Sequence, residues 1–594
     1  MFKTKTIFTL ISFLAFINLS AQNNPKFFSP TDFDIDAKLN QLFVAGKTAN
    51  EIRVYNLFDF SLDKSLVTER TPKAVKIAGD NLLLTQSYSE GELLVIDKNS
   101  LEIKSRIKVG HGACDIATTS DNKTAFVANQ FSNDISVVDL ENKKETNRIP
   151  VLRQPKQLEI SKDEKYLFVA NFLTINRADR DTVTSEITII DLQTEKPLKH
   201  IQLANGSNAL RGMALSVDGK YLFISHNLGR FQVPTTQLEQ GWMNTSALSV
   251  INTATLKFVA TVLLDEPEYG AAGSWGVECT EAFIFVAHSG THDFSKIDYP
   301  KFIEKLESYP DKASLSYNLR FLSDIRNRIK ADGNGPRTLK TFNNQLFVAN
   351  YFTDNISIFD LKASSNSVVK SIQLNEISEM DEVRLGEMYF NDATYCFQGW
   401  QSCNGCHPDE ARTDGLNWDL LNDGMGNPKN CKSMLLAHET PPAMITGIRL
   451  NAEAGVRAGF THIQFTHIEE AHAMAVDKYL RSLKAVPSPH LINGQLNKKA
   501  KKGKIIFENE SCNFCHSGNW FTDLKKHEMG RQGEYDHQNT WDTPTLIEVW
   551  RTGPYLHDGR CATMEEVFSI EKHGLRNELP EEEIEQLSEY VLSL

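Results

Sequence analysis

The chain lacks any apolar run that approaches the roughly 20 residues of a membrane-spanning helix, apart from a shorter run at its start. It is also short of positive charge, with 63 Lys and Arg against 76 Asp and Glu and a net charge of -13. Nucleic-acid binding relies on clustered Lys and Arg. The sequence therefore predicts no transmembrane segment and no nucleic-acid partner.

Cysteine is scarce and unevenly placed, with nine residues in a chain of 594. Seven of the nine lie at or after Cys396, and 11 of the 16 histidines lie at or after His407. The length is that of two or three domains. We therefore expect the chemistry of the protein to lie in the last third of the chain.

The first 21 residues have the pattern of an export signal. Lys3 and Lys5 precede an apolar run from Ile7 to Leu19, and Ala21 offers a small residue at the cleavage point. These 13 apolar-dominated residues are too few to span a bilayer, and the alternative is a buried N-terminal helix. No cysteine follows the cleavage point, so no lipid anchor is expected. We predict a soluble protein that is periplasmic or otherwise exported.

Residues 22–375 repeat a short apolar strand seven times. Successive copies are spaced by 40, 43 and 42 residues, and then by 55 to about 62. Most copies are followed by a strand of alternating apolar and polar residues, as in half-buried antiparallel sheets. A period just above 40 with four short strands per unit is typical of propeller blades. The copies are Leu42–Ala45, Leu82–Leu84, Ala125–Ala128, Leu167–Ala170, Leu222–Ile224, Phe283–Ala287 and Leu346–Ala349.

The Phe-Val-Ala-Asn and Ile-Ser-Val-Val-Asp elements of these repeats resemble the YVTN-type seven-bladed propellers of exported bacterial proteins. The resemblance implies an all-β, seven-bladed propeller. The longer spacings indicate inserted loops, and the insert Leu319–Ile329 has apolar residues at helical spacing, so we expect a helix there on the propeller edge. Lone histidines such as His226 and His288 are more often packed or solvated than ligating, and no metal site is predicted in this region.

Two Cys-x-x-Cys-His motifs are the strongest chemical signal in the chain. Two thiols at this spacing can each form a thioether with one haem vinyl group, and the following imidazole then lies under the iron as proximal ligand. The alternatives are a zinc knuckle and a redox dithiol, which need further ligands or a thioredoxin-like setting. We predict two covalently bound haem c groups. The motifs are Cys403, Cys406 and His407, and Cys512, Cys515 and His516.

The two motifs lie in two similar units, residues 380–486 and 490–594. Each unit has an apolar segment before its motif and closes with an apolar-periodic helix, at residues 471–483 and 581–594 respectively. Prolines at 487 and 489 separate the units, because proline ends a helix and stiffens the chain. This internal duplication predicts two all-α cytochrome c domains after the propeller.

The second unit carries a more specific pattern. Asp542–Leu546, Arg551–Arg560 with its Pro-Tyr-Leu-His-Asp-Gly core, and Ala562–Val567 resemble the C-terminal segment of the bacterial di-haem cytochrome c peroxidase and MauG family. The likeness extends over residues 380 to 594. It implies that the first haem is the low-potential site, where hydrogen peroxide binds, and that the second is the high-potential site, where electrons arrive.

The sixth ligands of the two irons depart from the family pattern. The family's axial ligand of the second haem falls close to Glu571, which is a weak haem ligand, so His573 is the better candidate and Met564 the next. For the first haem the alternatives are Met425, His438 and an open position. An open position favours peroxide chemistry, and two strong ligands favour electron transfer alone.

Other family features are less distinct here. Arg457–Phe460 stands where the family has an element with a tryptophan between the haems, which leaves Trp418, Trp520 and Trp541 as candidates for that role.

Acid–base help at the first iron needs a carboxylate or an imidazole, and Glu439, His438 and Glu453 are the candidates. Cys396 and Cys431 flank the first motif and are expected to form a disulfide outside the cytoplasm.

The leading hypothesis is an exported di-haem oxidoreductase that reduces hydrogen peroxide at the first haem. Electrons would enter through the second haem from a soluble redox partner such as a small cytochrome or a cupredoxin. One alternative is a non-catalytic electron-transfer protein with the propeller as a partner-binding platform. Another makes the propeller the substrate-holding part of an oxidase. The sixth position of the first iron discriminates between catalysis and transfer.

Overall fold

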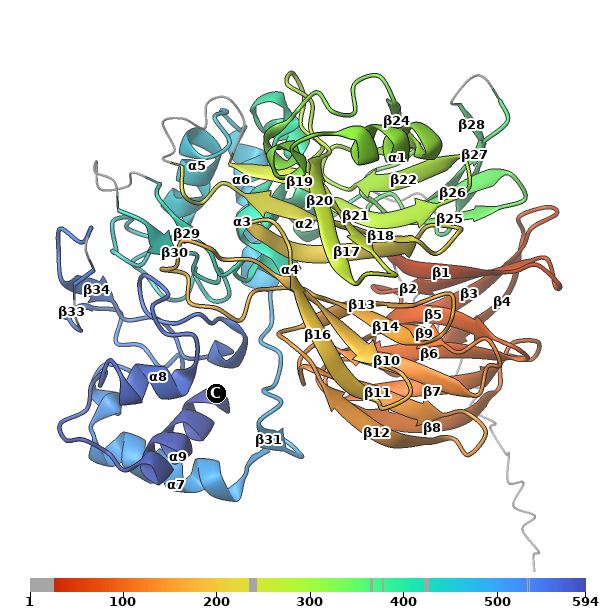
Figure 1. Cartoon of the computed structure of the whole chain (residues 1–594). Coiled ribbons are helices and arrows are strands. Elements are labelled where there is room, and N and C mark those ends of the chain that lie inside the picture. Colours follow the sequence, from red (N-terminus) through yellow and green to blue (C-terminus); the bar gives the residue numbers. More distant parts are fainter. Residues whose placement is uncertain are drawn as a thin grey trace, which may run out of the picture.

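The computed structural model of the chain describes residues 26–233, 243–363, 367–376, 379–420, 427–530, 532–533 and 535–594. The export signal predicted for residues 1–21 and the ligand candidate Met425 lie outside these ranges. Seven separate four-stranded sheets form the N-terminal part, and helices dominate the C-terminal part (Figure 1). The predicted seven-bladed propeller followed by a helical part is confirmed.

Each blade is one contiguous stretch of four antiparallel strands in sequential order. The first strands of neighbouring blades contact one another, so they form the inner ring around the axis. The first four blades consist of β1 (Pro30–Asp36), β2 (Gln41–Gly46), β3 (Glu51–Asn56) and β4 (Leu62–Val67); β5 (Pro72–Ala78), β6 (Asn81–Ser87), β7 (Gly91–Asp97) and β8 (Ile103–Val109); β9 (Ala113–Thr118), β10 (Thr124–Asn129), β11 (Asp134–Asp139) and β12 (Lys144–Pro150); and β13 (Pro155–Ile160), β14 (Tyr166–Asn171), β15 (Glu186–Asp191) and β16 (Lys196–Gln202). The last three consist of β17 (Ser207–Leu215), β18 (Tyr221–Gly229), β19 (Asn244–Asn252) and β20 (Lys257–Leu263); β21 (Ser274–Cys279), β22 (Phe283–His288), β23 (Asp293–Asp298) and β24 (Arg326–Lys330); and β25 (Pro336–Phe342), β26 (Gln345–Asn350), β27 (Asn355–Asp360) and β28 (Val368–Gln373).

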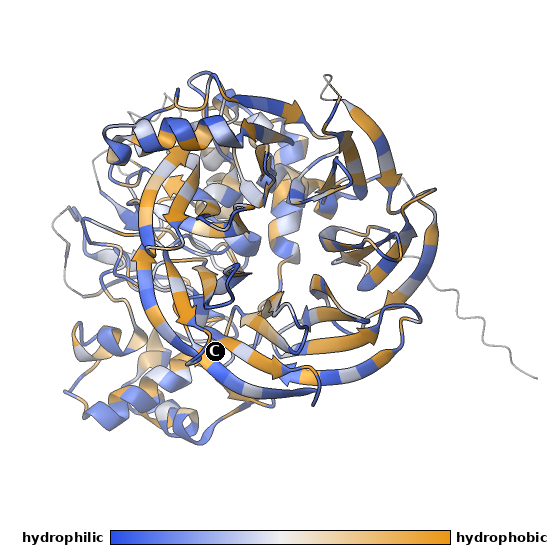
Figure 2. Cartoon of the chain, turned by 45° about the vertical axis from the view of Figure 1, so that its right-hand side comes forward, coloured by the Kyte–Doolittle hydropathy of each residue, from blue (hydrophilic) through white to orange (hydrophobic). Residues whose placement is uncertain are grey.

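The repeated apolar strand is the second strand of each blade. In β2 the residues from Leu42 to Ala45 are fully buried, because neighbouring blades cover both faces of the sheet. The outermost strands meet solvent, and β4 alternates between half-buried and exposed positions. Figure 2 shows the resulting orange and blue bands along the strands. The cores of the propeller therefore lie between adjacent blades.

The helix expected at Leu319–Ile329 is not there, and that prediction is wrong. Asp298 caps α1 (Tyr299–Ser308) by accepting from the Lys301 amide, and a proline lies in the first turn. Residues 326–330 form β24, the fourth strand of the sixth blade. Pairing of β24 with β23 outweighs the helical spacing of the apolar residues. Leu322, Ile325 and Ile329 are buried all the same.

The helical part contains two copies of one helix crossing. In the first, α2 (Glu382–Asn391) packs on α6 (Glu470–Ser482), and in the second, α7 (Lys498–Asn509) packs on α9 (Glu581–Leu592). A glycine stands at each crossing, because a Cβ there would clash with the facing helix. On Gly386 it would meet the Ala475 carbonyl oxygen at 1.9 Å, and on Gly503 it would meet the Gln586 carbonyl oxygen at 1.8 Å. The internal duplication predicted from the sequence therefore corresponds to the same close helix crossing, with a glycine at the contact, in both units.

The remaining elements of the helical part are short. They comprise the helices α3 (Cys403–Cys406), α4 (Pro408–Ala411), α5 (Ala452–His462) and α8 (Met564–Ser569), 3-10 turns, and three small two-stranded ribbons. Within the described ranges, no helix is long and apolar enough to cross a membrane.

The helical part packs directly on the propeller. The Gly270 amide donates to the Gln398 carbonyl at 2.8 Å, and the Ala178 amide donates to the Gly559 carbonyl at 2.9 Å. A Cβ on Gly270 would meet the Gly399 carbonyl oxygen at 2.5 Å, so the two backbones approach closely. Both helical units therefore touch the propeller.

Candidate haem sites

The first Cys-x-x-Cys-His motif occupies one helical turn, α3, with His407 directly after it. Nδ1 of His407 lies 3.1 Å from the backbone carbonyl oxygen of Arg412. When Nδ1 donates to this oxygen, Nε2 is left unprotonated for a metal. Burial lowers the pKa of His407 to about 4, so the imidazole is neutral around neutral pH. Such a histidine is prepared to ligate a metal.

A cavity of about 220 Å³ adjoins the first motif. Cys403, Cys406 and His407 form part of its wall, together with residues of α5. The Gln464 amide donates to the Cys403 sulfur at 3.2 Å, and the Asn244 amide of the propeller donates to the Cys406 sulfur at 3.2 Å. The propeller thus contributes to the surroundings of the first motif.

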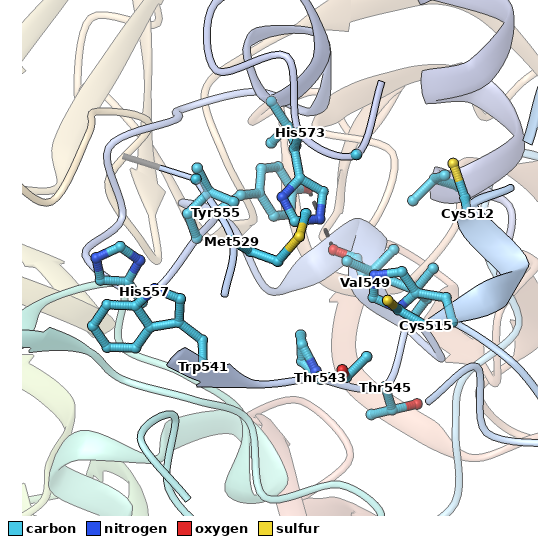
Figure 3. Close-up of a pocket in the computed structure, with 18 of the residues that line it drawn as sticks. Cys512, Cys515, Met529, Trp541, Thr543, Thr545, Val549, Tyr555, His557 and His573 are labelled. Atoms are coloured by element: carbon cyan, nitrogen blue, oxygen red, sulfur yellow. Dashed lines mark hydrogen bonds between the residues drawn. The ribbon is translucent and has the colours of Figure 1, made fainter. Parts of the chain in front are cut away.

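The second motif is built in the same way. Nδ1 of His516 lies 3.1 Å from the carbonyl oxygen of Phe521, which follows it by five residues in the sequence. Arg412 follows His407 by the same number of residues. A larger cavity of about 560 Å³ adjoins it, and Figure 3 shows Cys512 and Cys515 at its edge.

His573 faces His516 across the second cavity. It follows α8, and its amide donates to the Val567 carbonyl at 3.1 Å. The ring centres of the two imidazoles are 6.4 Å apart. Burial, with a smaller effect of His516, lowers the pKa of His573 to about 4. The sequence therefore pointed to a residue that the fold brings opposite the expected proximal ligand.

The separation of these rings fits a haem iron between them. A metal–nitrogen bond to imidazole is about 2 Å long, and each nitrogen is about 1 Å from its ring centre, so two trans imidazoles have centres about 6 Å apart. The observed 6.4 Å matches this spacing. The two cysteines of the motif border the same cavity. The residues present therefore fit a c-type haem with two histidine ligands.

Two methionines also line the second cavity. Met564 is nearly buried at the start of α8. Met529 lines it as well and is labelled in Figure 3. Sequence reasoning missed Met529, because it lies in an irregular segment far from the family's ligand position. Glu571, which is close to the family's ligand position, pairs with Arg560 at 3.7 Å.

The two cavities share one wall. Residues 430–433, together with Leu435, Ile445 and Thr545, border both. The Lys432 ammonium lies in this wall and pairs with Asp542 at 2.7 Å. Groups bound in the two cavities would thus be neighbours, as electron exchange between them requires.

None of the three tryptophans lines both cavities. Trp418 lines the first and donates to Asp414 at 2.9 Å. Trp541 lines the second and stacks on His557, with ring centres 3.8 Å apart (Figure 3). Trp520 is 40% exposed and lines neither of them.

The three acid–base candidates lie outside the first cavity wall. The His438 side chain is 2% exposed, and its Nε2 lies 2.9 Å from Asp477. Glu453 pairs with Arg481, and Glu439 also does not line the cavity. His462 and Lys432 do line it, although no motif in the sequence singles them out.

The disulfide expected between Cys396 and Cys431 is not formed, and both are free thiols. The Cys431 sulfur instead lies 3.1 Å from the Cys406 carbonyl oxygen and 3.5 Å from Nδ1 of His407. Flanking positions in sequence did not bring the two sulfurs together, because Cys431 packs on the motif itself.

The zinc alternative finds no support in the described part of the chain. No group of three or more His, Cys, Asp or Glu side chains there converges to hold a metal ion. Burial raises the pKa of Cys403 to about 12, so the free thiol is protonated, unlike the reactive thiolate of a redox dithiol.

The Pro-Tyr-Leu-His-Asp-Gly element stands at the junction of all three parts. Its His557 pairs with Asp536 at 2.7 Å and its carbonyl accepts from the Asn430 amide. Gly559 has a φ of 61°, and a Cβ there would meet Ala178 of the propeller at 2.6 Å. The element therefore holds the second unit against the first unit and the propeller.

The fold and the two cavities define a haem-binding redox protein with a propeller. No protein-family model matches the chain. Hydrazine synthase subunit gamma of Kuenenia stuttgartiensis is 27% identical over 273 residues, covering 36% of this chain and 77% of that protein. Cytochrome c551 peroxidase of Nitrosomonas europaea is 22% identical over 292 residues, covering 39% of this chain and 85% of that protein.

A solved structure of Kuenenia stuttgartiensis hydrazine synthase matches the chain with a TM-score of 0.52 and 20% identity, over 58% of this chain and 98% of the other. At this identity the match speaks for the fold alone. The homologues of the chain are hydrazine synthase subunits, the cytochrome c551 peroxidase and MauG proteins. The resemblance to the di-haem peroxidase family is confirmed, and a haem cofactor and an oxidoreductase function are supported.

Proposed function

We propose that this protein is an exported oxidoreductase with two covalently bound haem c groups, which reduces hydrogen peroxide at the first haem. Each thiol of a motif adds across one vinyl double bond, sulfur to one carbon and the thiol proton to the other. Cys403 and Cys406 hold the first haem, and Cys512 and Cys515 the second. His407 and His516 are the proximal ligands.

The observation that carries the proposal is the difference between the two sites. The ring of His573 lies 6.4 Å from that of His516, whereas no ring contact of this kind involves His407 among the described residues, although His462 lines the same cavity. Two histidines close an iron to exchangeable ligands and suit it to electron transfer. A site with one histidine leaves room for a small ligand such as peroxide.

When bound, the haems supply iron that changes oxidation state and, at an open position, binds a small molecule. The chain supplies the rest. Arg412 and Phe521 accept from Nδ1 of the proximal histidines and so fix their tautomers. The wall of residues 430–433 lies between the two cavities. Electrons reach the second site from a soluble donor protein, a small cytochrome or a cupredoxin.

A non-catalytic electron-transfer protein is the second candidate. The specific observation in its favour is that Glu439, His438 and Glu453 do not line the first cavity. For the peroxidase, His462, which does line the first cavity, is then the remaining imidazole for proton transfer.

The test is made on the full-length protein loaded with haem. Haem staining after denaturing electrophoresis should show covalent haem, reduced by half when Cys403 and Cys406 are both replaced by Ser. The half-reduced protein is then mixed with hydrogen peroxide. Reoxidation of the second haem supports the peroxidase, with His407→Ala and His516→Ala as controls. Absence of reoxidation, with both haems present and low-spin, supports electron transfer instead.

A further inference from the structure

The innermost strand of every blade is irregular near its start. At this point, in all seven blades, at least one residue of the innermost strand has no partner in the second strand. Such bulges re-aim side chains. Four of the seven blades have Lys or Arg among the skipped residues, which places a ring of cations at one level of the propeller. The skipped residues include Thr31, Lys73, Cys114, Lys156, Arg211, Trp275 and Arg337.

The cations of this ring, Lys73, Lys156, Arg211 and Arg337, are not neutralised by the propeller. Among the described residues none of them forms an ion pair with a propeller carboxylate. Arg211 is 6% exposed, and one of its guanidinium nitrogens has no hydrogen-bond partner. Burial, followed by the nearby Lys47, lowers the pKa of Lys73 to about 8. The ring is therefore short of negative charge.

The helical part supplies that charge from the segment directly after His407. Asp409 accepts from the Gln130 amide at 2.7 Å, lies 3.4 Å from the Lys156 ammonium and also pairs with Arg551. Glu410 pairs with Lys47, which lies just after β2. Both carboxylates also act electrostatically on Lys73, so they lie close to the ring of cations.

Backbone strain marks the same segment. Asp409 and Glu410 have φ values of 54° and 65°, in the left-handed region that residues other than glycine rarely adopt. Such conformations persist where surrounding contacts hold them. The ion pairs with the propeller are contacts of this kind.

A buried network continues from the docked segment to the proximal histidine. Arg412 binds Glu548 through two nitrogens at 2.8 and 2.9 Å, and both side chains are at most 3% exposed. Glu548 also pairs with Arg551, the partner of Asp409. The Arg412 carbonyl is the oxygen that faces Nδ1 of His407. The chain from the propeller to His407 is therefore continuous.

We propose that the cation ring of the propeller is an internal docking site for the acidic pair Asp409 and Glu410, and that this docking positions His407 and tunes the first haem. The inference rests on haem attachment at Cys403 and Cys406. Asp409 and Glu410 are positioning residues. The propeller is then a structural part of the first haem site, and its ring face is closed to outside partners.

The test reverses one ion pair in the full-length holoprotein. Glu410→Lys, Lys47→Glu and the double reversal are compared by spectroelectrochemical titration of both haems. Glu410→Lys should raise the midpoint potential of the first haem, because added positive charge disfavours the oxidised iron. Lys47→Glu should lower it. The double reversal should return it towards the wild-type value, with the second haem unchanged throughout.

The matched control reverses Lys499 and Glu585, an exposed pair at 2.7 Å in the second unit. If the first-haem potential moves no more in Glu410→Lys than in this control, the inference is overturned. If Glu410→Lys does not fold, the first-haem potential of Asp409→Asn, which keeps the shape of the side chain, is compared with the control instead. If haem counting finds no haem at the first motif, the proposed function fails. Docking is then judged by thermal midpoints, which the double reversal must restore.

Discussion

His573 has the surroundings of a metal ligand. Nδ1 of His407 and of His516 faces a backbone carbonyl, while the ring of His573 faces the open cavity and the His516 ring (Figure 3). Burial keeps His573 neutral by lowering its pKa to about 4, and a neutral imidazole is the form that binds a metal. No side-chain hydrogen bond joins His573 to another described residue, so its ring nitrogens are available to a metal.

Replacing His573 with Ala should convert the second haem from low-spin to high-spin, since one of two strong ligands is lost. Electron paramagnetic resonance and the visible spectrum of the oxidised protein measure this. His490→Ala is the control, because His490 pairs with Glu589 away from both cavities. A low-spin signal that persists unchanged would assign the ligand to Met529 or Met564 instead.

At the scale of elements, the two helix crossings depend on glycine. A Cβ on Gly503 would lie 1.8 Å from the Gln586 carbonyl oxygen, so α7 would have to move away from α9. Gly503→Ala should destabilise the second helical unit by about 3 kcal/mol, as overpacking does. Calorimetry of the full-length protein measures the loss. Gly459→Ala in α5 is the control, where no atom lies within 4 Å, and it should be neutral or slightly stabilising.

The elements that sequence predicted best are those with strong local periodicity. The repeated apolar strand predicted all seven blades, since each copy is buried on both faces between neighbours. The helix expected at Leu319–Ile329 failed because β24 pairs with β23, a contact that spacing alone does not reveal. Tertiary pairing decides such short ambiguous segments.

At the candidate sites, too, local patterns could be recognised in the sequence and tertiary contacts could not. The Cys-x-x-Cys-His motifs have a local chemical reason, and His573 was close to the family's ligand position. Lys432 and Met529 were missed, because their place in the cavity walls depends on loops without a pattern. The cation ring does have a sequence signal, since Pro72-Lys73, Pro155-Lys156 and Pro336-Arg337 recur at equivalent blade positions.

At the scale of the whole molecule, the propeller must be closed by contacts between its seventh and first blades. Each blade is contiguous, so no sheet joins the two ends of the propeller. Asp354 of the seventh blade accepts from the amides of Phe28 at 2.8 Å and Ser29 at 2.7 Å, just before the first blade. Lys340 pairs with Asp34 at 2.8 Å across the same boundary.

Asp354→Ala should therefore cost about 3 kcal/mol, because two buried amides lose their acceptor. Chemical unfolding of the full-length protein, followed by circular dichroism in the β region, measures the change. Asp360→Ala in the same blade removes one acceptor of an exposed turn and should cost less than about 1 kcal/mol. Equal losses for the two variants would show that closure does not depend on Asp354.

Buried carboxyls link the propeller's stability to pH. Burial, with Asp32 second, raises the pKa of Asp115 to about 7, although the Leu158 amide donates to it. Burial likewise raises the pKa of Glu159 to about 7, against the effect of Lys76. Because these folded-state values exceed those of the unfolded chain, the carboxyls stabilise the fold fully below about pH 4. That contribution is lost as the pH rises through about 7.

The propeller should thus be more stable at pH 5 than at pH 8, by on the order of 1–3 kcal/mol per carboxyl. Asp115→Asn should flatten this dependence, since the amide keeps an acceptor for the Leu158 amide and does not ionise. Calorimetric midpoints at several pH values measure it, with the exposed Glu141→Gln as control. A slope in Asp115→Asn equal to that of the wild type would mean that Asp115 is ionised in the folded protein across this range. Lys76 and Lys340, which both lower the pKa of Glu159, would then have to balance the negative charge in this part of the propeller.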